Sequence, residues 1–195
     1  MTRDIGPVST PLLILPLRHH DERGWFSETY SSARLVALGI HCDFPQDNQS
    51  YSRGAGTVRG LHFQRPPSAQ AKLVACLKGR IFDVVVDLRA GSPSYGHSVT
   101  VELTDQGEQL FVPVGFAHGF VTLTDDVIVS YKVSRLYNPS ADAGLAWNDP
   151  ALGIDWPLPA DGPIVSDKDV GLPLLSMLES PFAYDAGGAI RLNRA

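Results

Sequence analysis

Three residues that can carry acid–base chemistry lie close together in the segment 54–72. They are Arg59, His62 and Lys72, and strand-like runs lie on either side of the segment. Histidine is the usual general base near neutral pH, and arginine and lysine are the side chains that hold anionic ligands. We therefore predict a site that binds an anion and transfers a proton. A structural histidine is the alternative, because His62 is flanked by leucine and phenylalanine.

The spacing of Arg59 and His62 sets a geometric condition on such a site. Successive side chains of a strand point to opposite faces, so two residues three positions apart would face opposite sides. Gly60 lies between them and can adopt the conformation of a β-bulge, which adds one residue to a strand and re-aims a side chain. We predict a bulge at Gly60 that brings both side chains to one face.

A catalytic histidine needs a group that orients its second ring nitrogen, and a carboxylate is a common choice. Asp83, Asp87 and Asp169 are the candidates. Asp83 and Asp87 would share one face of an apolar strand, where a charge must be paired or must line a polar cavity. For these two, a structural ion pair, with Lys72 as a plausible partner, and a catalytic role are both open.

Two further polar features are candidates for a site. Tyr131 lies in the apolar run 127–133 and is either a core aromatic or a phenol that acts as a general acid beside a cation. The polar cluster at 46–50 is either a solvated loop or a set of hydrogen-bonding groups for a uracil- or thymine-like base or a sugar.

Charge and hydropathy argue against several classes of protein. The net charge is −5 and basic clusters are absent, which argues against nucleic-acid binding. No apolar run reaches the length that crosses a bilayer, and the apolar stretch 12–15 is too short and too interrupted by proline for a secretory signal. We therefore expect a cytoplasmic protein that does not associate with membranes.

Cysteine and histidine spacing does not suggest a metal site. Cys42 and Cys76 are 34 positions apart without metal-binding spacing, so we expect two buried free thiols. His118 is isolated, and the adjacent pair His19 and His20 would diverge on a strand. We therefore expect no metal site.

The fold that positions the candidate site residues is predicted to be β-rich. The sequence has 15 prolines and 18 glycines, which indicate many turns, and these alternate with valine-rich runs that are typical of strands. One short helix is predicted at 33–38, with Ser31 or Ser32 as its N-cap and Gly39 at its end. Short strands at such spacing are typical of a sandwich or a barrel. Strands are predicted at 25–30, 72–77, 81–88, 98–103, 109–112, 119–123 and 127–133.

The 195 residues are expected to form one domain, 1–195. An extended arm at 1–20 should end in a strand, because its prolines exclude a stable helix. Residues 138–170 are predicted to form an ordered, irregular segment that covers the sheet. A peripheral tail, 172–195, is expected to hold a short helix and a flexible end.

Ten short segments form a recognisable set: DERGWFSE at 21–28, PQDNQS at 45–50, VRGLHFQ at 58–64, QAKLV at 70–74, FDVVVDLR at 82–89, GSP at 91–93, PVGFAHGF at 113–120, YNP at 137–139, WNDP at 147–150 and SDKD at 166–169. Together they resemble the dTDP-4-dehydrorhamnose 3,5-epimerase family. They follow the family's order over residues 20–170, and the set is specific although each segment alone is weak.

The resemblance implies an all-β, cupin-like jelly-roll sandwich that works as a homodimer without a cofactor. It implies that His62 is the general base, oriented by Asp169, that Tyr131 is the proton donor, and that Lys72 stabilises an enolate. Phe26 would lie near the nucleotide's thymine base and would reach it from the partner subunit. Contacts to the nucleotide sugar are implied for Arg23, Phe26, Glu28, Gln46, Asn48, Arg59, Lys72, His118, Asp142 and Lys168, and Asp142 stands where the family usually has a glutamate.

The implied reaction is epimerisation of dTDP-4-dehydro-6-deoxy-D-glucose at C3 and C5, which gives dTDP-4-dehydro-L-rhamnose, the precursor of dTDP-L-rhamnose. Both carbons flank the 4-keto group, which makes their protons acidic. Inversion needs a base and an acid on opposite faces of the sugar, and the enolate needs a cationic clamp. Two alternatives stay open: a mono-epimerase that acts at C3 or C5 only, and a non-catalytic cupin-like sugar-binding module.

Overall fold

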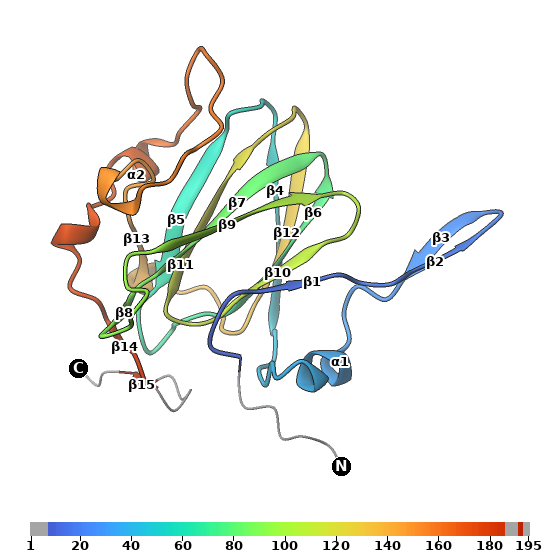
Figure 1. Ribbon diagram of the computed structural model, residues 1–195, viewed down its shortest axis with the longest axis horizontal. Coiled ribbons are helices and arrows are strands. Elements are labelled where there is room, and N and C mark those ends of the chain that lie inside the picture. The colour runs from blue at the N-terminus through green and yellow to red at the C-terminus, as the bar shows by residue number, and fades with distance from the viewer. Residues whose placement is uncertain (1–7, 186–190, 193–195) are drawn as a thin grey trace.

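Two five-stranded antiparallel sheets face each other in the computed structural model, which describes residues 8–185 and 191–192 (Figure 1). This arrangement confirms the predicted jelly-roll sandwich. The first sheet has the order β1 (Leu12–Ile14), β10 (Gln109–Val112), β6 (Lys72–Lys78), β12 (Val127–Val133) and β4 (Gln46–Ser52). The second has the order β13 (Asp142–Gly144), β5 (Val58–Gln64), β11 (Phe116–Thr122), β7 (Arg80–Asp87) and β9 (Ser98–Thr104).

Smaller elements lie around the sandwich. A hairpin of β2 (Arg18–Asp21) and β3 (Gly24–Ser27) projects away from it (Figure 1). The strand predicted at 25–30 therefore ends at Ser27, where the chain turns toward a helix. The remaining elements are α1 (Ser32–Ala37), β8 (Arg89–Ala90), α2 (Asp167–Val170), β14 (Phe182–Ala183), β15 (Arg191–Leu192) and the 3₁₀ turns at Pro139–Ala141, Pro150–Leu152 and Leu175–Met177.

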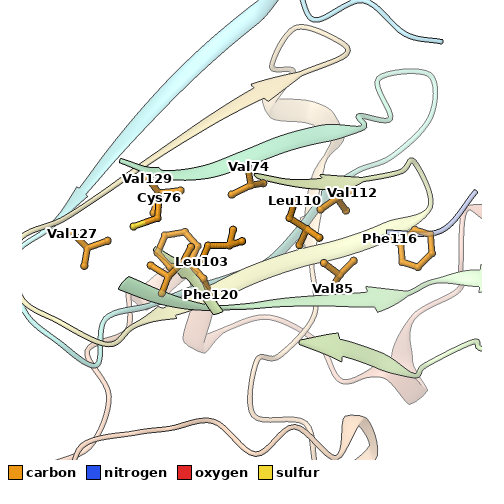
Figure 2. Close-up of a cluster of buried hydrophobic side chains, with 11 residues drawn as sticks. Val74, Cys76, Val85, Leu103, Leu110, Val112, Phe116, Phe120, Val127 and Val129 are labelled. Atoms are coloured by element: carbon orange, nitrogen blue, oxygen red, sulfur yellow. The ribbon is translucent and has the colours of Figure 1, made fainter. Parts of the chain in front are cut away.

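The apolar core lies between the two sheets (Figure 2). It takes alternate residues from facing strands, as the period of two in a strand requires. On β7 the consecutive valines divide between the two faces of the sheet: Val85 packs into this core, while Val84 and Val86 point to the other side of the second sheet. All three are at most 1% exposed.

The outer face of the second sheet is covered by the irregular segment that was predicted at 138–170. Leu145 and Leu152 of that segment are buried against Val84 and Val86 of β7. Phe182 joins them and is 1% exposed, so the tail is anchored in the core at this residue instead of lying entirely at the periphery as predicted. The predicted helix in the tail is a single 3₁₀ turn. Most of the predicted flexible end, and residues 1–7 of the predicted arm, lie outside the described residues.

The helix predicted at 33–38 is present one residue earlier, at Ser32–Ala37, between the predicted cap and the predicted glycine. Ser31 accepts a hydrogen bond from the backbone N–H of Arg34 and caps the first turn. Gly39 follows the last turn with a φ of 83°, which favours glycine. Leu35 is the buried residue of α1, which packs on the outer side of the first sheet. Among the described residues, no helix has the length and apolar character to cross a membrane.

Candidate active site

A cavity of about 520 Å³ lies between the two sheets, next to the apolar core. Its walls come from β4, β6 and β12 of the first sheet and from β5 and β11 of the second, with α2 and the start of β13 beside them. The cavity brings together most of the predicted site residues: His62, Tyr131, Asp169, Lys72, Gln46, Asn48, Arg59, His118, Asp142 and Lys168.

Strand alternation aims the first-sheet residues into the cavity. Lys72 lies two positions before the core residue Val74 on β6, and Tyr131 lies two positions after the core residue Val129 on β12. Each therefore continues a row of core side chains. The segment 46–50, for which a solvated loop was one alternative, is part of strand β4 and alternates inward-facing and exposed residues.

The predicted bulge at Gly60 is present in β5. His62 pairs with His118 of β11, and Arg59 pairs with Phe120. The two pairs are therefore three residues apart on β5 but only two residues apart on β11, which means that β5 contains one extra residue. Gly60 has a φ of 121°, and an added Cβ would lie 2.6 Å from the Cα of Gly119. The extra residue turns both Arg59 and His62 into the cavity.

Asp169 is the carboxylate that contacts the predicted base. The Nε2 atom of His62 lies 2.6 Å from Oδ1 of Asp169, and Oδ2 accepts a hydrogen bond of 3.1 Å from the N–H of Gly60. Ser166 caps α2 by accepting from the N–H of Asp169. Burial alone would raise the pKa of Asp169, but the hydrogen bonds from His62 and Gly60 outweigh it and lower the pKa. The carboxylate therefore stays ionised and fixes the imidazole.

Lys72 is 8% exposed and donates a hydrogen bond of 3.1 Å to the backbone oxygen of His62. Burial lowers the pKa of Lys72 to about 8, although the negative charges of Asp83 and Asp142 oppose the shift. The structure therefore holds a cation in the cavity whose charge is lost at a mildly alkaline pH.

Neither aspartate of β7 forms the suggested ion pair with Lys72. Asp83 instead contacts His118, whose Nε2 lies 3.0 and 2.9 Å from the two carboxylate oxygens. Asp87 pairs with Arg89 at 2.6 Å and accepts hydrogen bonds from two serine hydroxyls. The reason is geometric, because each aspartate has a nearer partner. Asp87 belongs to a buried network outside the cavity, and Asp83 orients a histidine inside it.

Tyr131 and His62 approach the cavity from opposite sheets. Burial raises the pKa of Tyr131, and the nearby positive charge of Arg59 offsets only part of this effect. The phenol therefore carries its proton at neutral pH and can donate it. A ligand between the sheets would have an acid on one side and a base on the other.

Three side chains at the cavity contact one another: Tyr137, Asp142 and Lys168. Asp142 pairs with the ammonium of Lys168 and accepts a hydrogen bond of 3.1 Å from the hydroxyl of Tyr137. Tyr137 is also tied to β4, because its N–H donates to Gln46 at 2.8 Å. Sequence reasoning did not assign Tyr137 to the site. Ser50, by contrast, belongs to the polar cluster at 46–50 that was a candidate, and it lines the cavity.

Three predicted residues lie outside the cavity, on or just after the β2–β3 hairpin. Phe26 is 70% exposed, and Arg23 pairs with Asp21 of the same hairpin. Glu28 lies 3.5 Å from Arg34 of α1. Within one chain, these residues are not brought to the site.

The family model described as dTDP-4-dehydrorhamnose 3,5-epimerase matches residues 7–177. The chain is 48% identical to the dTDP-4-dehydrorhamnose 3,5-epimerase of Sinorhizobium fredii over 173 residues, which are 88% of each protein. It resembles the crystal structure of that enzyme from Bacillus anthracis with TDP and PPi bound, at 48% identity and a TM-score of 0.82, over 84% of this chain and 93% of the other. It also resembles dTDP-6-deoxy-D-glucose-3,5-epimerase of Legionella pneumophila in complex with dTDP-4-keto-L-rhamnose, at 37% identity and a TM-score of 0.83, over 98% and 99% of the two chains.

Proposed function

This chain belongs to the dTDP-4-dehydrorhamnose 3,5-epimerase family, and we propose that its cavity converts dTDP-4-dehydro-6-deoxy-D-glucose to dTDP-4-dehydro-L-rhamnose. The observation that carries this proposal is the pair formed by His62 and Asp169 on one wall with Tyr131 on the other. A base and an acid on opposite sides of a bound sugar are what an inversion at carbon requires.

In the proposed mechanism His62 removes the proton from the carbon next to the 4-keto group. The ionised Asp169 holds the imidazole and stabilises the imidazolium that forms. The electron pair moves to the ketone oxygen, where the ammonium of Lys72 stabilises the enolate. Tyr131 then delivers a proton to the opposite face of the same carbon. The cycle repeats at the second carbon, and proton exchange with water restores both residues.

The nucleotide half of the ligand needs cations for its two phosphates and hydrogen-bonding groups for its base and sugar. We assign Arg59 to the phosphates, with support from Lys168 and His118, because all three line the cavity. Gln46, Asn48 and Asp142 are assigned to polar contacts with the same ligand. This local cationic group explains how a chain with a net charge of −5 can hold an anionic substrate.

We further propose that the enzyme is a cytoplasmic, single-domain homodimer in which the hairpin of one subunit completes the cavity of the other. The projection of the β2–β3 hairpin away from its own sandwich supports this arrangement (Figure 1). Phe26 at 70% exposure and Trp25 at 54% would otherwise leave two aromatic rings in water. Arg23, Phe26 and Glu28 would then contact the ligand held by the partner subunit.

Incubation with the dTDP-4-keto-6-deoxy sugar in deuterated water tests the reaction. Proton abstraction and return from solvent should place deuterium at both C3 and C5, and NMR counts the exchanged positions. Deuterium at one position would identify a mono-epimerase. His62→Asn and Tyr131→Phe should each abolish product formation while dTDP binding is retained. Unchanged product yield in both variants would contradict catalysis and favour a sugar-binding module.

A further inference from the structure

We propose that Ser52 is a positioning residue that orients the guanidinium of Arg59 toward the phosphates of the bound nucleotide. The inference rests on the proposed function, because that function assigns Arg59 to the phosphates. Ser52 does not line the cavity, and its role is exerted through Arg59 alone.

Ser52 is the last residue of β4 and continues the inward-facing row of that strand. It is 3% exposed, and its Oγ accepts a hydrogen bond of 3.0 Å from Nε of Arg59. The adjacent backbone oxygen of Tyr51 accepts a second bond of 2.9 Å from Nη2 of the same guanidinium. Two of the three guanidinium nitrogens are therefore fixed to β4. Within residues 8–185 and 191–192, no hydrogen bond is recorded for Nη1, which remains available to a ligand.

The contact connects the two sheets at one end of the cavity. Ser52 belongs to the first sheet, and Arg59 belongs to β5 of the second. The bulge at Gly60 decides which face the Arg59 side chain leaves from, but a long side chain can still adopt many rotamers. The serine hydroxyl removes much of that freedom before the ligand arrives. Preorganisation of this kind increases affinity, because less conformational entropy is lost on binding.

The strand end that carries Ser52 is itself anchored. The hydroxyl of Tyr51 is hydrogen-bonded to Asp126, in the turn before β12, and Ser52 pairs in register with Val127. Arg59 also influences Tyr131, since its charge partly offsets the burial effect on the pKa of that phenol. A displaced guanidinium would therefore weaken phosphate binding and raise the pKa of Tyr131 further.

The test measures binding of dTDP and of thymidine to the intact protein by calorimetry. Ser52→Ala should raise the Kd for dTDP about fivefold, the effect of one typical intramolecular hydrogen bond, and leave the Kd for thymidine unchanged. KM for the dTDP-sugar should rise by a similar factor. In an Arg59→Ala background, Ser52→Ala should not weaken dTDP binding further, because the guanidinium through which Ser52 acts is already absent. The double-mutant cycle measures this coupling.

Thr122→Val is the matched control. The Thr122 hydroxyl is also buried and bonds only to backbone, donating to Gly54 and accepting from Thr57. Its loss should lower the melting temperature without changing the Kd for dTDP. Should Ser52→Ala not fold, Ser52→Cys keeps the size with a weaker acceptor and carries the same expectation.

Two results separate failure of this inference from failure of the proposed function. If Arg59→Ala does not change the Kd for dTDP, the assignment of Arg59 to the phosphates is wrong. If Arg59→Ala weakens dTDP binding but Ser52→Ala does not, the positioning role alone is wrong. The positioning role is also wrong if Ser52→Ala has its full effect without Arg59, or if thymidine binding falls equally.

Discussion

The ionisable side chains of the cavity owe their protonation states to burial and to the partners that oppose or reinforce it. Asp169 is buried, yet its hydrogen bonds from His62 and Gly60 lower its pKa. Lys72 has no ion-pair partner among the described residues, so burial lowers its pKa to about 8. Tyr131 is buried near Arg59, and its pKa stays raised. The cavity thus holds an anion, a cation and a neutral acid within one small volume.

The depressed pKa of Lys72 predicts the alkaline side of the pH profile. If its ammonium stabilises the enolate, kcat should fall as pH rises through about 8, because the charged form is then lost. An exposed lysine, with a pKa of about 10.4, would keep the rate constant to a higher pH. Measurement of kcat between pH 6 and 10 tests this. Lys72→Arg keeps its charge over this range and should remove the decline; a decline that persists in this variant would belong to another group.

Asp169→Asn is expected to lower kcat by about 100-fold or more, because the imidazolium formed during catalysis loses its stabilising charge. The amide is nearly the same size as the carboxylate, so KM should change little. The rate of deuterium exchange into the substrate measures the proton-transfer step directly. Asp167→Asn on the same helix is the control, since Asp167 is exposed and does not line the cavity. Equal losses in the two variants would argue against a specific role for Asp169.

Among the secondary-structure elements, β5 decides the geometry of the site. Its bulge is built from two glycines that pack against each other, Gly60 of β5 and Gly119 of β11. A Cβ on Gly119 would lie 2.6 Å from the backbone oxygen of Arg59. The close approach of these two backbones fixes the positions from which Arg59 and His62 enter the cavity. It leaves no room for a side chain at either glycine.

Gly60→Ala should destabilise the protein by at least about 2 kcal/mol, because both the positive φ and the contact with Gly119 oppose a Cβ. Activity should also fall, since Arg59 and His62 are displaced. Denaturant unfolding measures the change in free energy. Gly24→Ala provides the comparison: Gly24 has a similar φ of 132°, but nothing lies within 4 Å of its added Cβ. Its cost should therefore be smaller, and equal costs would rule out the close approach as the cause.

At the scale of the whole molecule, most of the predicted site lies in the cavity of one chain, but three of the predicted contacts lie on or just after a projecting hairpin. The sandwich brings β4, β5, β6, β11 and β12 around the cavity, although these strands are distant in sequence. The β2–β3 hairpin projects away from the sandwich (Figure 1), and its residues Arg23 and Phe26 do not line the cavity. A second subunit is the simplest way to bring the two parts together.

Mixing two inactive variants tests this arrangement. One variant carries His62→Asn with an intact hairpin, and the other carries Arg23→Ala and Phe26→Ala with an intact His62. If each hairpin serves the partner subunit, random reassortment should restore about one quarter of the wild-type activity, because half of the dimers contain one complete cavity. Activity after mild dissociation and reassociation is the measurement. No recovery, despite mixed dimers detected by mass spectrometry, would contradict a contribution across the subunit interface.

The sequence alone determined the β-rich class, most strand positions and the short helix, because these depend on local periodicity, turn residues and capping. Strands β10 and β12 begin and end as predicted, and Ser31 and Gly39 border α1 as expected. The sequence also identified Gly60 as a bulge, because Arg59 and His62 could share a face only if one residue were added.

Only the tertiary structure decided which side chains meet. Local spacing left Asp83, Asp87 and Asp169 all as candidates to orient His62, and only the family resemblance singled out Asp169, because pairing between distant segments is not encoded in local spacing. The fold brings Asp169 to His62 across 107 positions, gives Asp83 to His118, and leaves Asp87 with Arg89. The low pKa of Lys72 likewise follows from burial, which no single segment reveals. The physical reason is that burial and long-range contacts belong to the packed sandwich and not to any strand by itself.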